Sequence, residues 1–188
     1  MSKKTKNIIF QLVFAAAVIA VAFYFASLVR ESDAARGIVV RYGYIGIFVV
    51  SIVSGFNLAV PVPAIAFLPV FLEAGLNVWF TIFLITAGMT LADIIAYWFG
   101  KIGERILSYS MEQKILADIQ EMREKYRWLP IFLLFLFAAL VPMPNEIFVI
   151  PLGFVGYRLL HVLPAVFAGN LVFNTLYALG IASLFELF

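Results

Sequence analysis

Six polar side chains interrupt the long apolar runs of this 188-residue chain, and they are its candidates for chemistry. They are two carboxylates and four carboxamides: Asp93, Glu146, Asn57, Asn145, Asn170 and Asn174. A carboxylate among apolar residues is costly unless it is protonated, paired or hydrated, so it is a candidate functional group. Glu146 suits proton transfer or the binding of a cationic headgroup, or alternatively the capping of a helix that begins after Pro144. Asp93 suits transport, or alternatively a structural bond to an arginine or to Asn174.

The chain contains few residues of the types that commonly serve in catalysis. Cysteine is absent and there is one histidine, His161, so thiol chemistry and cysteine ligands are excluded. A histidine-based metal site or a Ser-His-Asp triad would depend on that one residue. We therefore expect no enzymatic activity, no metal and no other cofactor.

The composition points to lipid as the solvent of this chain. Hydrophobic residues make up 64% of it and charged residues 13%, with a mean hydropathy of +1.05. A soluble domain of this size could not bury so much apolar surface. We predict an all-α polytopic membrane protein.

Two apolar segments 81 positions apart resemble each other. Val60–Phe67 and Val141–Phe148 each contain a Pro-x-Pro sequence, and these prolines are Pro61, Pro63, Pro142 and Pro144. The same offset relates three further pairs: Gly75 and Gly156, Gly88 and Gly169, and Asp93 and Asn174. Repeated, proline-broken apolar segments are typical of the binding site of a transporter. We expect the four glycines to permit close packing of helices.

The order of apolar and polar segments predicts an N-terminal unit and a membrane domain. Residues 1–36 are predicted to contain a basic cytoplasmic tail and a transmembrane anchor, and a polar interval at residues 30–41 follows the apolar run of the anchor. Residues 37–188 contain re-entrant hairpins at 43–72 and 128–153, transmembrane helices at 77–100 and 157–187, and an amphipathic surface helix at 104–127. In the first hairpin, only about a dozen apolar residues follow Pro61, which is too few for a second full crossing.

The distribution of basic residues supports this topology. If each proline-broken run returns to the side that it entered, ten of the 13 basic residues share the side of the N-terminus. Basic residues favour the cytoplasmic side, so the N-terminus is predicted to be cytoplasmic. Each repeat then consists of one hairpin and one crossing helix. Because each repeat crosses the membrane once, the second repeat is inverted relative to the first. The hairpin tips would meet near the midplane, where backbone carbonyls freed by proline line a polar cavity.

Several of these residues resemble motifs of the DedA family, whose shared module is called the VTT or SNARE-associated domain. The resemblance covers roughly residues 40–185 and is strongest in three motifs: Pro61-Val62-Pro63, Ala74-Gly75 and Gly88-x4-Asp93-x3-Tyr97-x2-Gly100-Lys101. It implies an integral protein of a prokaryotic plasma membrane that moves lipids between leaflets. The second hairpin departs from the family pattern because no arginine lies near Pro142.

The leading interpretation is a membrane lipid transporter, of flippase or scramblase type, with the proton as a coupling ion. Its partners would be membrane lipids (a phospholipid or a polyprenyl phosphate) and other copies of the chain, and not nucleic acid. One alternative is a small-molecule or multidrug exporter on the same fold. Another is a membrane assembly factor that transports nothing.

Overall fold

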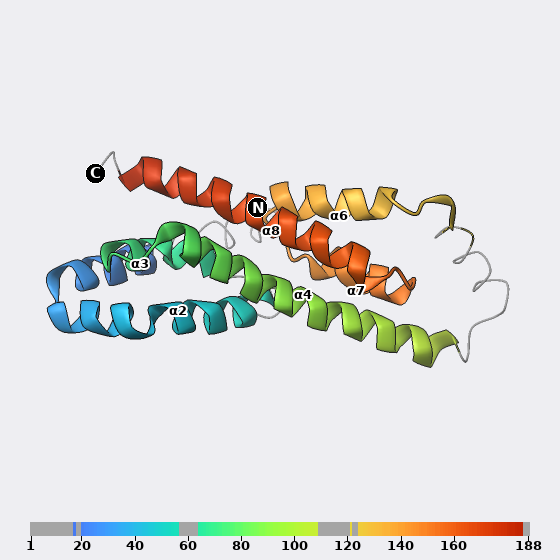
Figure 1. The fold of residues 1–188 in the computed structure, drawn as a ribbon, viewed down its shortest axis with the longest axis horizontal. Helices are drawn as coiled ribbons and strands as arrows, with labels where there is room; N and C mark the ends of the chain where they lie inside the picture. The colour runs from blue at the N-terminus through green and yellow to red at the C-terminus, as the bar shows by residue number, and fades with distance from the viewer. Residues whose placement is uncertain (1–16, 18–19, 57–63, 109–120, 122–123, 186–188) are drawn as a thin grey trace, which may run out of the picture.

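The computed structural model describes residues 17, 20–56, 64–108, 121 and 124–185, and within these ranges it contains helices and turns but no strand. In chain order the helices are α2 (Asp33–Gly55), the 3-10 helix η1 (Ala64–Phe67), α3 (Leu68–Glu73), α4 (Val78–Ser108), α6 (Leu129–Leu140), α7 (Glu146–Phe154) and α8 (Leu159–Phe185) (Figure 1). Residues 20–31 are also helical and precede α2.

Three of the described helices are long and apolar enough to cross a membrane. They are α2, the stretch Val78–Gly103 of α4 and the stretch Leu159–Gly180 of α8. The shortest of these stretches has 22 residues, and a helix of that length extends about 33 Å, slightly more than the hydrocarbon core of a bilayer. The predictions of an all-helical chain and of a membrane protein are confirmed to this extent.

The helix α2 begins ten residues earlier than the hairpin predicted at 43–72. The side chain of Ser32 caps it, because the Ser32 hydroxyl accepts a hydrogen bond from the Ala35 N–H at 3.3 Å, and Asp33 lies in the first turn. Serine at the cap and an acidic residue in the first turn both stabilise a helix start. The polar interval at 30–41 is therefore mostly helical.

Two predicted segments lie mostly outside the described residues. Of the anchor predicted within residues 1–36, residues 1–16 and 18–19 lie outside the described residues. Most of the amphipathic helix predicted at 104–127 does so as well, and its first residues, 104–108, continue α4. No glycine or proline follows Gly103 in this stretch, so nothing in the sequence ends the helix there.

Two short helices, α3 and α7, end in the same way. Gly75 follows α3 with a φ of 82°, and its N–H donates to the Leu72 carbonyl at 2.9 Å while the Leu76 N–H donates to the Phe71 carbonyl at 3.0 Å. This is the Schellman arrangement. It favours glycine because the residue after the helix must adopt a left-handed backbone conformation, which glycine adopts readily. The same two bonds, shifted by 81 positions, end α7 at Gly156, whose φ is also 82°. Our expectation that both glycines serve helix packing was therefore wrong, since they end helices.

The other glycine pair does permit close packing. A methyl group on Gly88 of α4 would lie 2.8 Å from the Phe48 carbonyl oxygen of α2. A methyl group on Gly169 of α8 would lie 2.9 Å from the Phe135 carbonyl oxygen of α6. The helix α4 thus packs closely on α2, and α8 packs closely on α6, at two glycines that are 81 residues apart.

A third close contact joins the two halves of the chain. A methyl group on Gly100 of α4 would overlap the Ile150 carbonyl of α7, and one on Gly153 of α7 would overlap the Tyr97 carbonyl of α4. The Tyr97 hydroxyl also donates to the Tyr157 carbonyl at 2.7 Å, just after α7. As a result α7 lies along the second half of α4.

The helices α4 and α8 run side by side in opposite directions through the length of the molecule (Figure 1). The helices α2 and α3 lie near the beginning of α4, whereas α6 and α7 lie near its end (Figure 1). Each end has its own apolar core. One contains Ile47, Ile65, Leu68, Ile82 and Ile85, and the other contains Leu134, Val149, Leu152, Val162 and Val166.

The helices α2 and α6 both end beside the middle of a longer helix. A methyl group on Gly55, the last residue of α2, would touch Ala92, near the middle of the apolar stretch of α4. Ala138, near the end of α6, lies against Gly169, near the middle of the apolar stretch of α8. This arrangement brings the ends of α2 and α6 to the centre of the molecule.

Candidate functional site

A buried polar cluster lies where α4, α7 and α8 meet. The side-chain amide of Asn145 donates to the Asn170 carbonyl oxygen at 2.8 Å and to the Asp93 carboxylate at 3.2 Å. The Asn170 amide donates to the same carboxylate oxygen at 2.9 Å. All three side chains are buried, with 2% of Asp93, 7% of Asn145 and 1% of Asn170 exposed. The three residues therefore form a closed triangle of hydrogen bonds, which we call the polar triad.

The triad continues as a polar strip along the contact between α4 and α8. The Asn170 amide also donates to the Thr90 hydroxyl at 3.4 Å. One turn further along α8, the Asn174 amide donates to the Thr86 hydroxyl at 3.1 Å and to the Met89 sulfur at 3.6 Å. Residues three and four apart share one helix face, so Thr86, Thr90 and Asp93 form a single stripe. Apart from the bond between Asn145 and Asn170, each of these bonds joins the first half of the chain to the second.

The partners of Asp93 differ from those predicted. Asp93 accepts hydrogen bonds from the amides of Asn145 and Asn170, rather than pairing with an arginine or with Asn174. The reason is the antiparallel register of α4 and α8, which places Asn174 one turn away, opposite Thr86. The Asn174 carbonyl oxygen is buried without a hydrogen-bond partner among the described residues.

Glu146 is the first residue of α7 and is 2% exposed. It directly follows Asn145, which is the N-cap residue of the helix but makes no capping bond with its side chain. The Asn145 amide is instead committed to the triad. A carboxylate in the first turn interacts favourably with the positive end of a helix. Both roles considered for Glu146, a helix-end carboxylate and a functional group beside a polar site, agree with this position.

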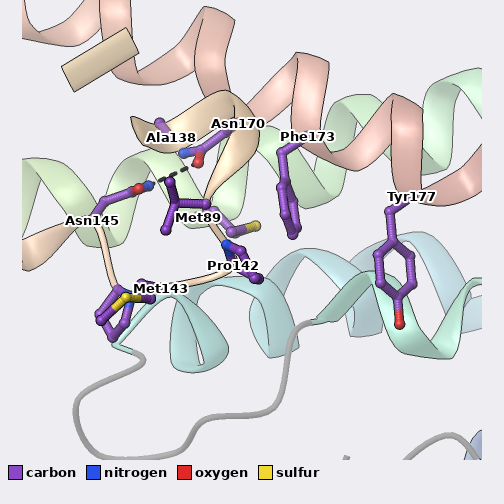
Figure 2. A pocket seen from close by; sticks show the side chains of 10 residues that line it. Met89, Ala138, Pro142, Met143, Asn145, Asn170, Phe173 and Tyr177 are labelled. Atoms are coloured by element: carbon purple, nitrogen blue, oxygen red, sulfur yellow. Dashed lines mark hydrogen bonds between the residues drawn. The ribbon is translucent and has the colours of Figure 1, made fainter. Parts of the chain in front are cut away.

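A cavity of about 140 Å³ opens beside the triad (Figure 2). Asn145 and Asn170 supply its polar wall, and the dashed line in Figure 2 marks the bond between them. The rest of the wall is largely apolar and includes Met89, Pro142, Met143, Phe173 and Tyr177. Pro142 and Pro144, which were predicted to form a hairpin tip, both line this cavity.

The structure thus brings most of the predicted site residues together. The exceptions are Asn57, Pro61 and Pro63, which lie outside the described residues. Sequence reasoning missed Thr86 and Thr90, although their spacing from Asp93 places them on its helix face. A search for polar residues three, four and seven positions from Asp93 would have found them.

The chemistry available in this cluster is hydrogen bonding and charge binding. Carboxamides both donate and accept hydrogen bonds, and a carboxylate accepts them. Among the described residues, no three histidine, cysteine, aspartate or glutamate side chains come close enough to hold a metal ion.

Comparisons of the chain with protein-family models, with curated proteins and with solved structures returned no match.

Proposed function

We propose that this chain is a membrane lipid transporter of flippase or scramblase type, built from two inverted halves. The observation that carries the proposal is the polar triad, which lies halfway along two candidate membrane spans and beside a cavity. Buried polar groups at such a depth are costly and usually serve a substrate or ion pathway. The resemblance to the DedA family implies the same class of activity.

In this proposal the two proline-broken hairpins are re-entrant. If Val78–Gly103 crosses the bilayer, Ala92 lies 14 residues (92 − 78) from its start, which is about 21 Å along the helix and close to the midplane. Because Gly55 packs against Ala92, α2 would end near that depth.

The chain would then return to the side from which it came. Arg30, just before α2, forms an ion pair with Glu73 at the end of α3. Nearby, the Tyr44 hydroxyl of α2 accepts a hydrogen bond from the Asn77 N–H at 3.0 Å. The beginning of α2 and the end of α3 therefore lie at the same end of the molecule, as a re-entrant hairpin requires.

The two halves are, in this proposal, inverted copies. The helices α4 and α8 run in opposite directions, and each follows a short helix that ends at a left-handed glycine (Figure 1). Gly88 and Gly169, which are 81 positions apart, pack closely against α2 and α6, respectively. Inverted halves around a central site allow access from either face of a membrane.

The last part of the proposal concerns the ligand. The cavity combines two carboxamides with an apolar wall of proline, methionine and aromatic residues. A surface of this kind suits an amphiphile, whose polar headgroup would bind the amides while its chains remain against the apolar wall or in the lipid. Glu146, one residue from the triad, is the group that we propose for proton coupling.

Transport in proteoliposomes tests the proposal. The purified chain is reconstituted with a fluorescent phosphatidylethanolamine, and dithionite is added to bleach the label in the outer leaflet. We expect the wild-type protein to make nearly all of the label accessible, and Asn145→Ala and Glu146→Gln to lose most of this activity. Ile45→Ala is a suitable control, because Ile45 is 69% exposed and far from the triad in sequence. If only about half of the label is bleached with the wild-type protein, as in empty vesicles, the chain does not move this lipid.

One observation favours a second candidate, an exporter of hydrophobic cations. The described residues that line the cavity include no lysine, arginine or histidine, whereas Asp93 and Glu146 are buried close to it. A cation would find acidic and amide partners there and no like charge. Uptake of a fluorescent lipophilic cation by the same vesicles, driven by a pH gradient, distinguishes this candidate from the first.

A further inference from the structure

A second and larger cavity, of about 650 Å³, lies at the other end of α4 from α2 and α3. Four of the charged residues that the structure describes line it: Lys101 from α4, Glu124 and Arg127 from the segment before α6, and Arg158 from the turn before α8. The imidazole of His161, in the first turn of α8, completes the set. Among these described residues, three cations therefore face one carboxylate. We call this cavity the basic pocket.

Aromatic contacts hold part of the basic pocket in place. The Arg127 guanidinium lies over the Trp128 ring, 5.5 Å from its centroid. The Trp128 ring meets the His161 ring edge to face, with 5.1 Å between centroids. Trp128 is 60% exposed, and tryptophan favours the boundary between lipid and water. The basic pocket is therefore expected at the level of the lipid headgroups.

The start of α8 differs from the equivalent start of α4 in the residue at the helix end. At the start of α4, the Asn77 side chain accepts a hydrogen bond from the Phe80 N–H at 2.9 Å, so the protein caps this helix itself. The position equivalent to Asn77 in the second half, 81 residues on, is Arg158. An arginine side chain has no acceptor for the N–H groups of a first helical turn. The first half thus supplies an acceptor where the second half supplies a cation.

We propose that the basic pocket binds a phosphate group, which either an anionic phospholipid headgroup or free phosphate could supply. Arginine binds phosphate through paired, charge-assisted hydrogen bonds, and a helix start adds the partial positive charge of its backbone. Basic pockets between membrane helices near the headgroup level are suited to anionic lipids. This site is separate from the polar triad, so the proposal does not depend on transport.

Binding of short-chain lipids to the full-length protein in detergent tests the proposal. Dioctanoyl phosphatidylglycerol, dioctanoyl phosphatidylcholine and inorganic phosphate are titrated separately, and dissociation constants are measured by native mass spectrometry. We expect phosphatidylglycerol to bind more tightly than phosphatidylcholine. Removing one charge-assisted arginine contact is expected to weaken that binding about tenfold or more, so Arg127→Gln combined with Arg158→Gln should nearly abolish the preference.

Arg41→Gln is the matched control, because Arg41 is an arginine in α2 whose guanidinium also lies over a neighbouring aromatic ring, that of Tyr42. It should leave binding unchanged. Arg158→Lys retains the charge and should retain most of the preference, which separates loss of the site from loss of the fold. Competition by inorganic phosphate at millimolar concentration would identify free phosphate as a ligand, whereas no competition would identify the lipid headgroup. Equal binding of the two lipids, or an unchanged preference in the double variant, would overturn the proposal.

Discussion

Asn170 of α8 bonds to Asn145 before α7 and to two residues of α4. Replacing Asn170 by alanine therefore removes all three of these hydrogen bonds. The Asn170 side chain accepts a hydrogen bond from Asn145 at 2.8 Å and donates to Asp93 at 2.9 Å and to Thr90 at 3.4 Å. Hydrogen bonds between membrane helices contribute about 0.6 kcal/mol each on average, and up to about 1.7 kcal/mol. Two short bonds and one long bond, together with the partners left buried, give an expected loss of about 2–3 kcal/mol in the free energy of unfolding.

Asn174→Ala is the matched control for this prediction. Asn174 lies one turn further along α8 and is fully buried, but it makes only one short bond, to Thr86, and one long bond to the Met89 sulfur. We expect it to cost about 0.5–1 kcal/mol. In a double-mutant cycle, Asp93→Ala and Asn170→Ala should show a coupling energy of about 1 kcal/mol, because the two residues share a bond.

Unfolding by sodium dodecyl sulfate in mixed micelles, followed by far-ultraviolet circular dichroism, measures these free energies. The three tryptophans provide a second probe of the same transition. The reasoning fails if Asn170→Ala costs no more than Asn174→Ala, or if the coupling energy is within error of zero. The first result would mean that the triad holds α4 against α8 no better than the bonds of Asn174 do, and the second that Asp93 and Asn170 are not energetically coupled.

Three further predictions concern packing and helix ends. Gly100→Ala should destabilise the protein by at least about 2 kcal/mol in the same assay, because its methyl group would overlap the α7 backbone, whereas Gly37→Ala, with nothing within 4 Å, should be neutral or stabilising. Gly156→Ala and Gly75→Ala should each cost about 1 kcal/mol, because each forces a side chain into a left-handed backbone, and similar losses would agree with equivalent roles. Arg30→Gln should change the free energy of unfolding by less than about 1 kcal/mol, because the arginine is 63% exposed and water screens its ion pair; a larger loss would show that the pair is a structural anchor.

The residues of the polar triad could be predicted from the sequence because amides and carboxylates are rare in apolar runs. Asp93, Asn145 and Asn170 stand out for that reason alone. Their bonding could not be predicted, because it depends on the register between α4 and α8. That register is seen only in the folded structure, where Thr90 lies opposite Asn170 and Thr86 lies opposite Asn174.

Other features escaped prediction for local reasons. Thr86 and Thr90 resemble ordinary helical residues, because a threonine hydroxyl can bond to its own helix backbone and needs no visible partner in the sequence. The start of α2 was missed because Arg30, Asp33 and Arg36 were interpreted as a connecting segment. The Ser32 cap gave the correct signal, but a polar interval next to an apolar run is also typical of a loop.

The most direct test of the account is the depth of the end of α2 in a bilayer. The chain has no native cysteine, so single spin labels can be attached at Ile38, Val53 and Ile102, which are 63%, 57% and 50% exposed. In lipid nanodiscs, accessibility to oxygen and to a polar nickel complex gives the depth of each label. The account predicts that Val53 lies near the centre of the bilayer, with Ile38 and Ile102 near opposite surfaces. If Val53 is as accessible to the nickel complex as Ile102, α2 crosses the membrane completely and the re-entrant hairpin is wrong.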